Sequence, residues 1–251
     1  MNPLTFLFRK KSSFFKLPLR FHTRKQRSFS DPLAIKKEEE LQKRYHFGYV
    51  KKELSSFDYQ SNLSYLAMLD SVRDVFSSAP FSSFKSVDVG SGNFHYVSAL
   101  HFFYSSFKKV EALHGIEVDA FKRYKNWRSR YDYAMFYIRQ KENTFYHPLN
   151  FLDFKEQVTC LTMFLPFVLP FPLLKWGLPY SYYKPEKLMA HAYSLLKPNG
   201  IWVIVNQGKE EQQAQHELLH KLNIPFENRG LFSSAFYSYE VPRYITVIVK
   251  T

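Results

Sequence analysis

Strand-like and helix-like segments alternate along the chain from residue 84 onward, and this alternation limits the fold more than any other feature. The apolar run "FKSVDV" (84–89) is typical of a buried strand, whereas "FHYVSALHFFYSSF" (94–107) carries apolar residues at helical spacing. Such alternation favours a parallel sheet wound with helices on both faces. Two β-like segments, 226–234 and 244–251, follow each other without a helix between them, so we expect the last strand to enter antiparallel.

The same patterns divide the chain into three parts. Residues 1–33 form a basic tail that we expect to be disordered, 34–80 a helical extension and 81–251 the sheet domain. The other expected elements are helices at 36–45, 62–76, 120–138, 184–196 and 209–223, and strands at 109–118, within 143–154, at 158–165 and at 201–206.

The basic charge is concentrated in the tail. Of the 35 lysine and arginine residues, eight lie within 1–30, which holds no acidic residue, so the rest of the chain carries 27 basic against 22 acidic residues. A basic tail can bind RNA, DNA or an anionic membrane without sequence preference. A solvated leader without a partner is the alternative. The acid-free, serine-containing tail also fits an organellar transit peptide if the source is eukaryotic.

Neither a disulfide framework nor a membrane span is expected. The chain has one cysteine, Cys160, which fits a reducing compartment such as the cytoplasm. The uncharged stretch 157–174 is long enough to span a bilayer, but Pro166, Pro170 and Pro172 interrupt it. We therefore interpret it as a buried strand that continues into a proline-stiffened loop. No cluster of histidine and acidic residues has the spacing of metal ligands.

A glycine-rich turn follows the first expected strand. In "VDVGSGNFHY" (87–96), Asp88 ends the strand and Gly90, Ser91 and Gly92 form the turn before the next helix. Ligands of doubly wound sheets bind at the carboxyl ends of the strands, where such a turn lies. Glycine allows a tight bend and leaves backbone N–H groups open to a ligand, although a flexible turn without a ligand is the plainer interpretation.

An acid at the end of the second strand favours a ligand-binding turn over a merely flexible one. Glu117 lies 27 residues after Gly90, in "HGIEVD". An acid at this place accepts hydrogen bonds from two vicinal ribose hydroxyls. Asp119 better suits the first turn of the following helix. At the end of the third strand, the Asn150 amide could meet an adenine edge, and Asp153 could serve as a cap.

Together these features resemble the class I SAM-dependent methyltransferases, in which S-adenosylmethionine (SAM) is the methyl donor. The resemblance covers roughly residues 60–251, and its motifs match at Asp88, Gly90, Gly92, Glu117 and Asn150, with Ser91 between the glycines. It also covers the turn "LKPNG" (196–200) and the last strand, "YITVIVKT" (244–251). The resemblance implies a seven-stranded, mostly parallel, doubly wound sheet with an antiparallel last strand, and SAM as cofactor.

Two positions depart from the family pattern. Phe94 stands where the family usually has a third glycine, so its ring could cover the ligand or partly fill the pocket. Asn150 replaces an acid, which keeps hydrogen bonding but removes the charge. The family's Asn/Asp-Pro-Pro-Tyr motif after the fourth strand is also missing, since Leu165, Pro166 and Phe167 stand there, which disfavours methylation of adenine or glutamine nitrogen.

No catalytic residue can be assigned from the sequence. His95, His114 and His147 lie nearest the expected strand ends, where each could be a general base or a merely packed side chain. We expect Cys160 to be a buried structural thiol.

Two groups of side chains could serve the acceptor. Aromatic residues in the 164–183 loop and before the last strand could line a substrate mouth, or they could pack in the core; they are Trp176, Tyr180, Tyr182, Tyr183, Phe236, Tyr237 and Tyr239. A basic run on the expected helix 120–138 is a solvated face or, alternatively, a phosphate track; it comprises Lys122, Arg123, Lys125, Arg128 and Arg130.

The expected activity is therefore methyl transfer from SAM to an unassigned acceptor, with RNA favoured over others by the basic tail and the aromatic residues. A methyltransferase-fold binding or assembly factor without catalysis is one alternative, and a small-molecule or lipid methyltransferase is the other. We expect a cytoplasmic protein, or an organellar one if the tail is a transit peptide.

Overall fold

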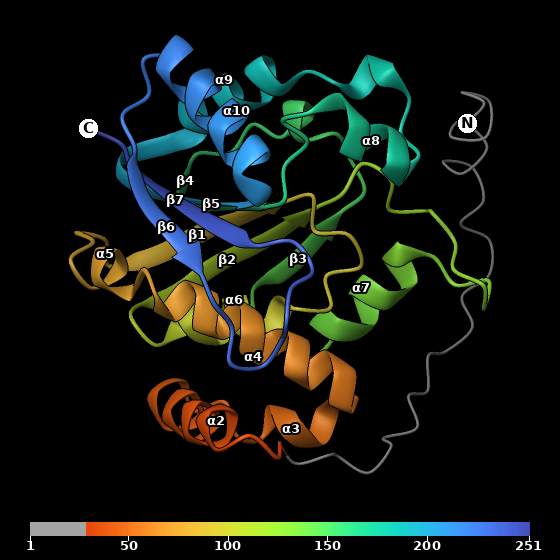
Figure 1. Cartoon of the computed structure of the whole chain (residues 1–251), viewed down its shortest axis with the longest axis vertical. Helices are drawn as coiled ribbons and strands as arrows, with labels where there is room; N and C mark the ends of the chain where they lie inside the picture. Colours follow the sequence, from red (N-terminus) through yellow and green to blue (C-terminus); the bar gives the residue numbers. More distant parts are fainter. Residues whose placement is uncertain (1–28) are drawn as a thin grey trace.

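The computed structural model describes residues 29–251, and its centre is a seven-stranded sheet (Figure 1). The strands are β1 (Ser83–Val89), β2 (Lys109–Ile116), β3 (Thr144–His147), β4 (Val158–Phe164), β5 (Leu196–Gln207), β6 (Glu227–Phe232) and β7 (Arg243–Val249), in the spatial order β3-β2-β1-β4-β5-β7-β6. β1 to β5 pair in parallel, and β7 runs antiparallel to both β5 and β6. The predicted doubly wound sheet with an antiparallel last strand is confirmed.

Helices cover both faces of this sheet, as Figure 1 shows. One face carries α4 (Ser56–Asp70), α6 (Val97–Ser105) and α7 (Arg130–Ile138), and the other carries α9 (Pro185–Leu195) and α10 (Gly208–Lys221). Each face has its own apolar core. Phe84, Leu113 and Phe103 belong to the first core, and Val87, Leu161 and Trp202 to the second, because alternate residues of a strand point to opposite faces.

The N-terminal extension folds as helices against the first face. It comprises α2 (Pro32–Tyr45), α3 (Val50–Glu53), α4 and α5 (Arg73–Ser77), so the predicted helix 62–76 is in fact two helices separated near Ser71. Ser55 caps α4 by accepting a hydrogen bond from the Asp58 amide, and α4 packs on α6. Of the predicted tail 1–33, residues 1–28 lie outside the described residues.

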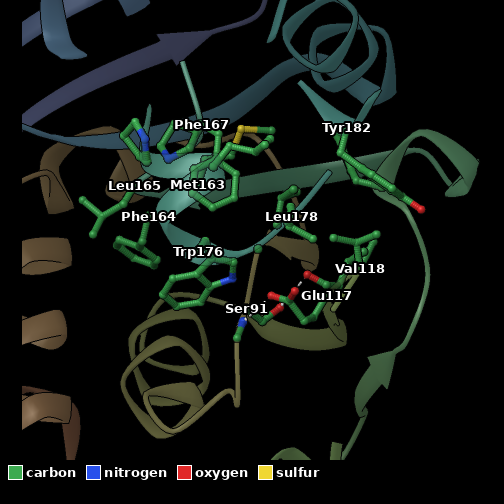
Figure 2. Close-up of a pocket in the computed structure, with 18 of the residues that line it drawn as sticks. Ser91, Glu117, Val118, Met163, Phe164, Leu165, Phe167, Trp176, Leu178 and Tyr182 are labelled. Carbon is green, nitrogen blue, oxygen red and sulfur yellow. Dashed lines mark hydrogen bonds between the residues drawn. The ribbon is translucent and has the colours of Figure 1, made fainter. Parts of the chain in front are cut away.

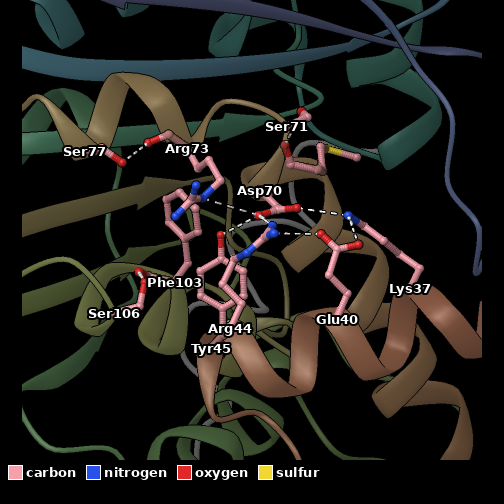
Figure 3. A network of polar contacts seen from close by, with 11 residues as sticks. Lys37, Glu40, Arg44, Tyr45, Asp70, Ser71, Arg73, Ser77, Phe103 and Ser106 are labelled. Atoms are coloured by element: carbon pink, nitrogen blue, oxygen red, sulfur yellow. Dashed lines mark hydrogen bonds and ion pairs between the residues drawn. The ribbon is translucent and has the colours of Figure 1, made fainter.

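A buried carboxylate joins α2 to α4 (Figure 3). Asp70 accepts hydrogen bonds from Lys37 Nζ at 3.0 Å, Arg44 Nη1 at 2.6 Å and the Tyr45 hydroxyl at 2.7 Å. Burial opposes the charge of Asp70, but these three donors keep its pKa below the ordinary value. The extension is thereby attached to the helix that packs directly on the sheet domain.

The prediction of a helix over 120–138 is wrong for its first half, residues 120–129. The helix α7 begins only at Arg130, where Ser129 and Asp132 form a capping box, and residues 120–129 form turns with an isolated bridge between Arg123 and Ser129. Asp119 is consequently not in the first turn of a helix. It is a buried residue of the loop that follows β2.

The apolar stretch 157–174 is β4 followed by a loop that enters the short helix α8 (Pro170–Trp176). The 3-10 turn η2 (Tyr180–Tyr182) leads on to α9. Among the helices of residues 29–251, none is both long enough and apolar enough to cross a membrane.

Candidate cofactor and acceptor site

The glycine turn after β1 forms an open backbone cradle. Gly90 and Gly92 have φ angles of 77° and 57°, in the left-handed region that favours glycine. A Cβ placed on either residue would meet no atom within 4 Å, so open space lies beside the turn. The amides of Gly90 and Ser91 both donate to the Ile116 carbonyl, at 2.9 and 3.0 Å, which fixes the turn to the end of β2.

Glu117 follows β2 directly and points toward this turn. Its Oε2 accepts a hydrogen bond from the Gly92 amide at 2.9 Å, and its Oε1 accepts one from the Asp119 amide at 2.8 Å. Burial raises the pKa of Glu117, and the Arg130 guanidinium, 3.4 Å away, acts in the opposite direction. A carboxylate oxygen can accept more than one hydrogen bond, so Glu117 can still receive hydroxyl donors from a ligand.

Arg130 has a role that differs from the predicted solvated basic face. Its side chain is buried and lies 3.6 Å from Asp119 Oδ2 as well as beside Glu117. Its guanidinium also lies over the Trp176 ring, 4.3 Å from the ring centroid. Arg130 thus connects the acid at the end of β2 to α8, whereas Lys122, Arg123, Lys125 and Arg128 belong to the loop before α7.

Asp88 lies behind the cradle and does not line the pocket. Its side chain is fully buried, and its two carboxylate oxygens accept hydrogen bonds from the hydroxyls of Tyr96, at 2.7 Å, and Thr162, at 2.6 Å. Burial raises the pKa of Asp88 to about 7, although the two hydroxyl donors favour the charged form. Asp88 therefore positions the start of the turn by linking β1 to β4 and α6.

This buried acid predicts a measurable pH dependence of stability. Folding raises the pKa of Asp88 from 3.8 to about 7, so the folded state binds the proton more tightly. The free energy of unfolding should therefore fall as pH rises from about 4 to about 7, by up to about 1.4 kcal/mol per pH unit. In Asp88→Asn this decline should flatten, as measured by urea denaturation across the same pH range. An equal decline in the variant would assign the titration to another group.

Phe94 does not enter the pocket, contrary to one expectation from the sequence. It adopts the positive φ that a glycine would otherwise provide, 56°, and its side chain is fully buried. The ring lies against Gly115 of β2, where a Cβ would come within 2.6 Å of the ring carbon Cε1. The missing side chain at position 115 therefore makes the space that the Phe94 ring fills.

Asn150 lies on the same pocket as the cradle, at the start of the 3-10 turn η1 (Phe151–Asp153). Its Oδ1 accepts a hydrogen bond from the Leu152 amide at 3.1 Å, so Asn150 is the cap of this turn and Asp153 is exposed. Its Nδ2 is the group that could donate to a ring nitrogen of a base.

These features converge on one pocket of about 1090 Å³. Gly90, Ser91, Gly92, Glu117 and Asn150 all line it. In the view of Figure 2, Trp176 lies between Ser91 and Glu117 on one side and the end of β4, with Met163, Phe164 and the following Leu165, on the other. The carbonyl of Trp176 accepts a hydrogen bond from Lys122 Nζ at 2.6 Å, which holds α8 close to the loop after β2.

Four of the seven aromatic residues predicted to line a substrate entrance do line a pocket. Trp176 and Tyr182 line the large pocket, and Tyr237 and Tyr239 line a second pocket of about 210 Å³. The other three pack elsewhere: the Tyr183 hydroxyl donates to the Val168 carbonyl, Phe236 is buried against Phe29, and Tyr180 is exposed.

Of the three candidate histidines, His95 is the one that lines these pockets, and it lines both. Its Nδ1 lies 2.9 Å from Asn93 Oδ1, and its Nε2 lies 2.9 Å from the Ser61 hydroxyl. Because an amide oxygen only accepts, Nδ1 carries the proton and Nε2 has the lone pair. Burial lowers the pKa of His95, which favours this neutral form. His114 and His147 instead contact each other at 2.9 Å and pack on Phe154.

Sequence reasoning missed the contribution of the extension. Phe57, Asp58 and Tyr65 of α4 line the large pocket, although they precede the first strand in the sequence. Helical periodicity shows which face of such a helix is apolar, but it does not show that part of that face borders a cavity. The aromatic residues at 57 and 65 were the available signal.

No family model matches the sequence, and no curated protein matches it. Solved structures do show a likeness, which was found by shape. A magnesium protoporphyrin IX methyltransferase from Synechocystis, solved with bound SAM, is 10% identical, with a TM-score of 0.49 over 79% of this chain and 86% of that one. An rRNA methylase from Streptococcus thermophilus is 13% identical, with a TM-score of 0.46 over 71% and 93%.

A third similar structure, a SAM-dependent methyltransferase from Aquifex aeolicus, is 15% identical, with a TM-score of 0.48 over 72% of this chain and 89% of that one. The fold is assigned from the directions and order of the strands, and not from these identities and TM-scores. The sheet has seven strands, its last strand β7 is antiparallel, and a glycine turn follows β1. This is the architecture that the sequence resemblance implied. This chain has the fold of the class I SAM-dependent methyltransferases.

Proposed function

We propose that this chain is a methyltransferase that uses SAM as its methyl donor. The observation that carries the proposal is the convergence of three strand ends on one pocket: the open cradle of Gly90 and Gly92 after β1, the Glu117 carboxylate after β2 and the Asn150 amide after β3. A nucleoside has a ribose with two vicinal hydroxyls and a base with a polar edge, and these groups match that spacing along the sheet.

The residues present fit this cofactor. The space in which a Cβ of Gly90 or Gly92 would stand is open, so the backbone can approach a ligand closely. Glu117 would accept from the ribose hydroxyls, and Asn150 would meet the adenine. When bound, SAM supplies a methyl group that its sulfonium already activates. Phe164 lines the pocket and offers the aromatic surface that a cation favours, whereas the Trp176 ring already has the Arg130 guanidinium over it.

The side chains then have to orient an acceptor, exclude water and take a proton where the acceptor carries one. His95 is the candidate for the last task, because it lines both pockets and its Nε2 can take a proton once it gives up the hydrogen bond from the Ser61 hydroxyl. Met163, Phe164 and Leu165 form an apolar wall that keeps water away.

Calorimetric titration tests the proposal directly. We expect SAM and its demethylated product to bind with micromolar dissociation constants, and NAD, which shares only the adenosine part, to bind at least about 30-fold more weakly, a difference of about 2 kcal/mol. Absence of SAM binding by protein whose unfolding is cooperative would refute the proposal and favour the non-catalytic binding factor. Phe94 no longer supports that alternative, because its ring lies outside the pocket.

For RNA as a partner, we propose that the basic tail supplies general affinity. Removing residues 1–28 deletes eight basic residues and leaves the α2 cap, Asp31, in place. We expect RNA affinity at about 50 mM salt to fall at least tenfold, and the dependence of log K on log salt to flatten, because fewer counterions are released. Fluorescence anisotropy with a single-stranded RNA measures both. Unchanged affinity and slope would exclude an electrostatic role of the tail.

A further inference from the structure

A second, smaller pocket opens beside the cofactor pocket. It has a volume of about 210 Å³ and shares five lining residues with the large pocket: Phe57, Tyr65, His95, Phe164 and Leu165. None of the cradle residues lines it, and neither does Glu117. We call it the tyrosine pocket, after Tyr65, Tyr237 and Tyr239, which line it. It lies on the side of α4, β5 and the segment before β7, away from the end of β2.

The walls of the tyrosine pocket are aromatic rings held by neighbours. Tyr65 stacks on Tyr96, with ring centroids 4.2 Å apart, and meets the edge of Phe164 at 4.8 Å. The Tyr239 hydroxyl lies 2.6 Å from the Ser64 hydroxyl, and the Tyr237 ring is 5.3 Å from that of Tyr239. Rings fixed in this way offer flat surfaces to a flat guest, with which they can stack or meet edge to face.

The volume limits the guest to about one ring. A cavity of about 150 Å³ holds benzene, so about 210 Å³ admits a single six-membered ring with small substituents. A lipid chain or a fused polycyclic molecule would extend beyond this pocket, which is not enclosed. The tyrosine pocket therefore favours a compact planar guest over the lipid acceptors that the aromatic composition alone left open.

One cation borders this pocket. The Arg243 guanidinium lies 4.5 Å from the centroid of the Tyr239 ring, and its Nη1 donates to the Val241 carbonyl at 2.8 Å. Within residues 29–251, no carboxylate forms an ion pair with Arg243; the nearby Glu211 is hydrogen-bonded to the backbone and side chain of Gln207. A guanidinium has five N–H donors in a planar fork, so Arg243 retains donors for an anion.

We propose that the tyrosine pocket is the acceptor subsite, and that it binds a single planar aromatic ring carrying an anionic group, with the ring between Tyr65 and Tyr237 and the anion on Arg243. The inference rests on the proposed methyltransferase function. The same chemistry occurs in a nucleotide of an RNA strand, as base and phosphate, and in a free aromatic acid.

Four probes test the proposal by calorimetry, with the product of SAM present at saturation and then without it. Uridine 5′-monophosphate and 4-hydroxybenzoate carry a ring and an anion, while uridine and phenol are their uncharged counterparts. We expect at least one anionic probe to bind, and Arg243→Gln to weaken it by about 10- to 100-fold while changing its uncharged counterpart less than threefold. Binding of the nucleotide points to RNA, and binding of the benzoate to a small-molecule acceptor.

Two further variants keep the result interpretable. Arg229→Gln removes an arginine that pairs with Asp74 and Glu227 away from the pocket, and should leave all probes unchanged. Tyr237→Ala, at a partly exposed ring, should weaken charged and uncharged probes alike. If neither anionic probe binds, or if binding is indifferent to Arg243, the inference fails while SAM binding stands. If SAM does not bind, it is the proposed function that fails.

Discussion

Glu117→Gln should weaken SAM binding by about 100-fold while leaving the protein folded. The carboxylate can accept from both ribose hydroxyls, and hydrogen bonds to a charged acceptor contribute about 1.5–3 kcal/mol each. The amide keeps one acceptor oxygen, loses the charge and turns its NH2 group toward the amide of Gly92 or Asp119, which then loses its acceptor. We therefore expect a loss of about 3 kcal/mol of binding free energy, or about 100-fold in affinity. Calorimetry with SAM measures it. Asp119 remains 3.6 Å from Arg130, so the buried guanidinium keeps a charged partner in the variant.

The matched control is Glu227→Gln, on the edge strand β6, where the carboxylate pairs with Arg229 at 3.0 Å. Its dissociation constant for SAM should equal that of the unmodified protein. A folded Glu117→Gln variant with unchanged affinity would mean that the ribose is not bound at the end of β2, and the cofactor site would have to be sought elsewhere.

Gly115→Ala should destabilise the fold by about 1–3 kcal/mol, although alanine is a modest change. The added Cβ would come within 2.6 Å of the Phe94 ring, and overpacking of a buried site has a cost of this size. The ring cannot swing aside, because it is fully buried, with the rings of Tyr96 and Tyr146 near it, at centroid distances of 5.9 and 6.1 Å.

A double-mutant cycle isolates this contact. Phe94→Ala alone should cost about 3–5 kcal/mol through the cavity that it leaves. In that background Gly115→Ala should cost less than about 0.5 kcal/mol, which gives a coupling of about 0.5–3 kcal/mol. Urea denaturation measures all four proteins. Gly48→Ala, whose Cβ would meet only Gln42 at 3.8 Å, is the control. Strict additivity would show that the ring does not occupy the space left by Gly115.

The sequence carried enough information for the sheet and for the grouping of the glycine turn, Glu117 and Asn150 on one pocket. Strand periodicity, the glycine turn and the acid after β2 depend on short local patterns, and local patterns are what a single sequence displays directly. The pairing of β1 with β4 places Asp88 opposite Thr162. No local sequence pattern predicts this contact, because the two residues lie on different strands.

The predicted helix 120–138 failed for a local reason that could have been recognised. Its composition suits a helix throughout, but Ser129 and Asp132 have the spacing of a capping box, which marks a start at residue 130. Trp127, with a φ of 65°, belongs to the turn before it. The buried position of Arg130 follows from that start.

The tyrosine pocket could not be predicted, because it depends on contacts between distant segments. Tyr65, Phe164 and Tyr239 meet around one small pocket although they are far apart in the sequence. Each is an ordinary aromatic residue in a chain with 19% aromatic residues, so none stands out before the fold is known.

The place of α4 in the walls of both pockets has a consequence for how such a protein could change its substrate. Residues of α4, which precede the first strand, line the tyrosine pocket together with residues that follow it, whereas the glycine turn, Glu117 and Asn150 all lie after that strand begins. If the proposed subsites hold, substitutions in α4 can alter the choice of acceptor without touching the residues proposed to bind the donor.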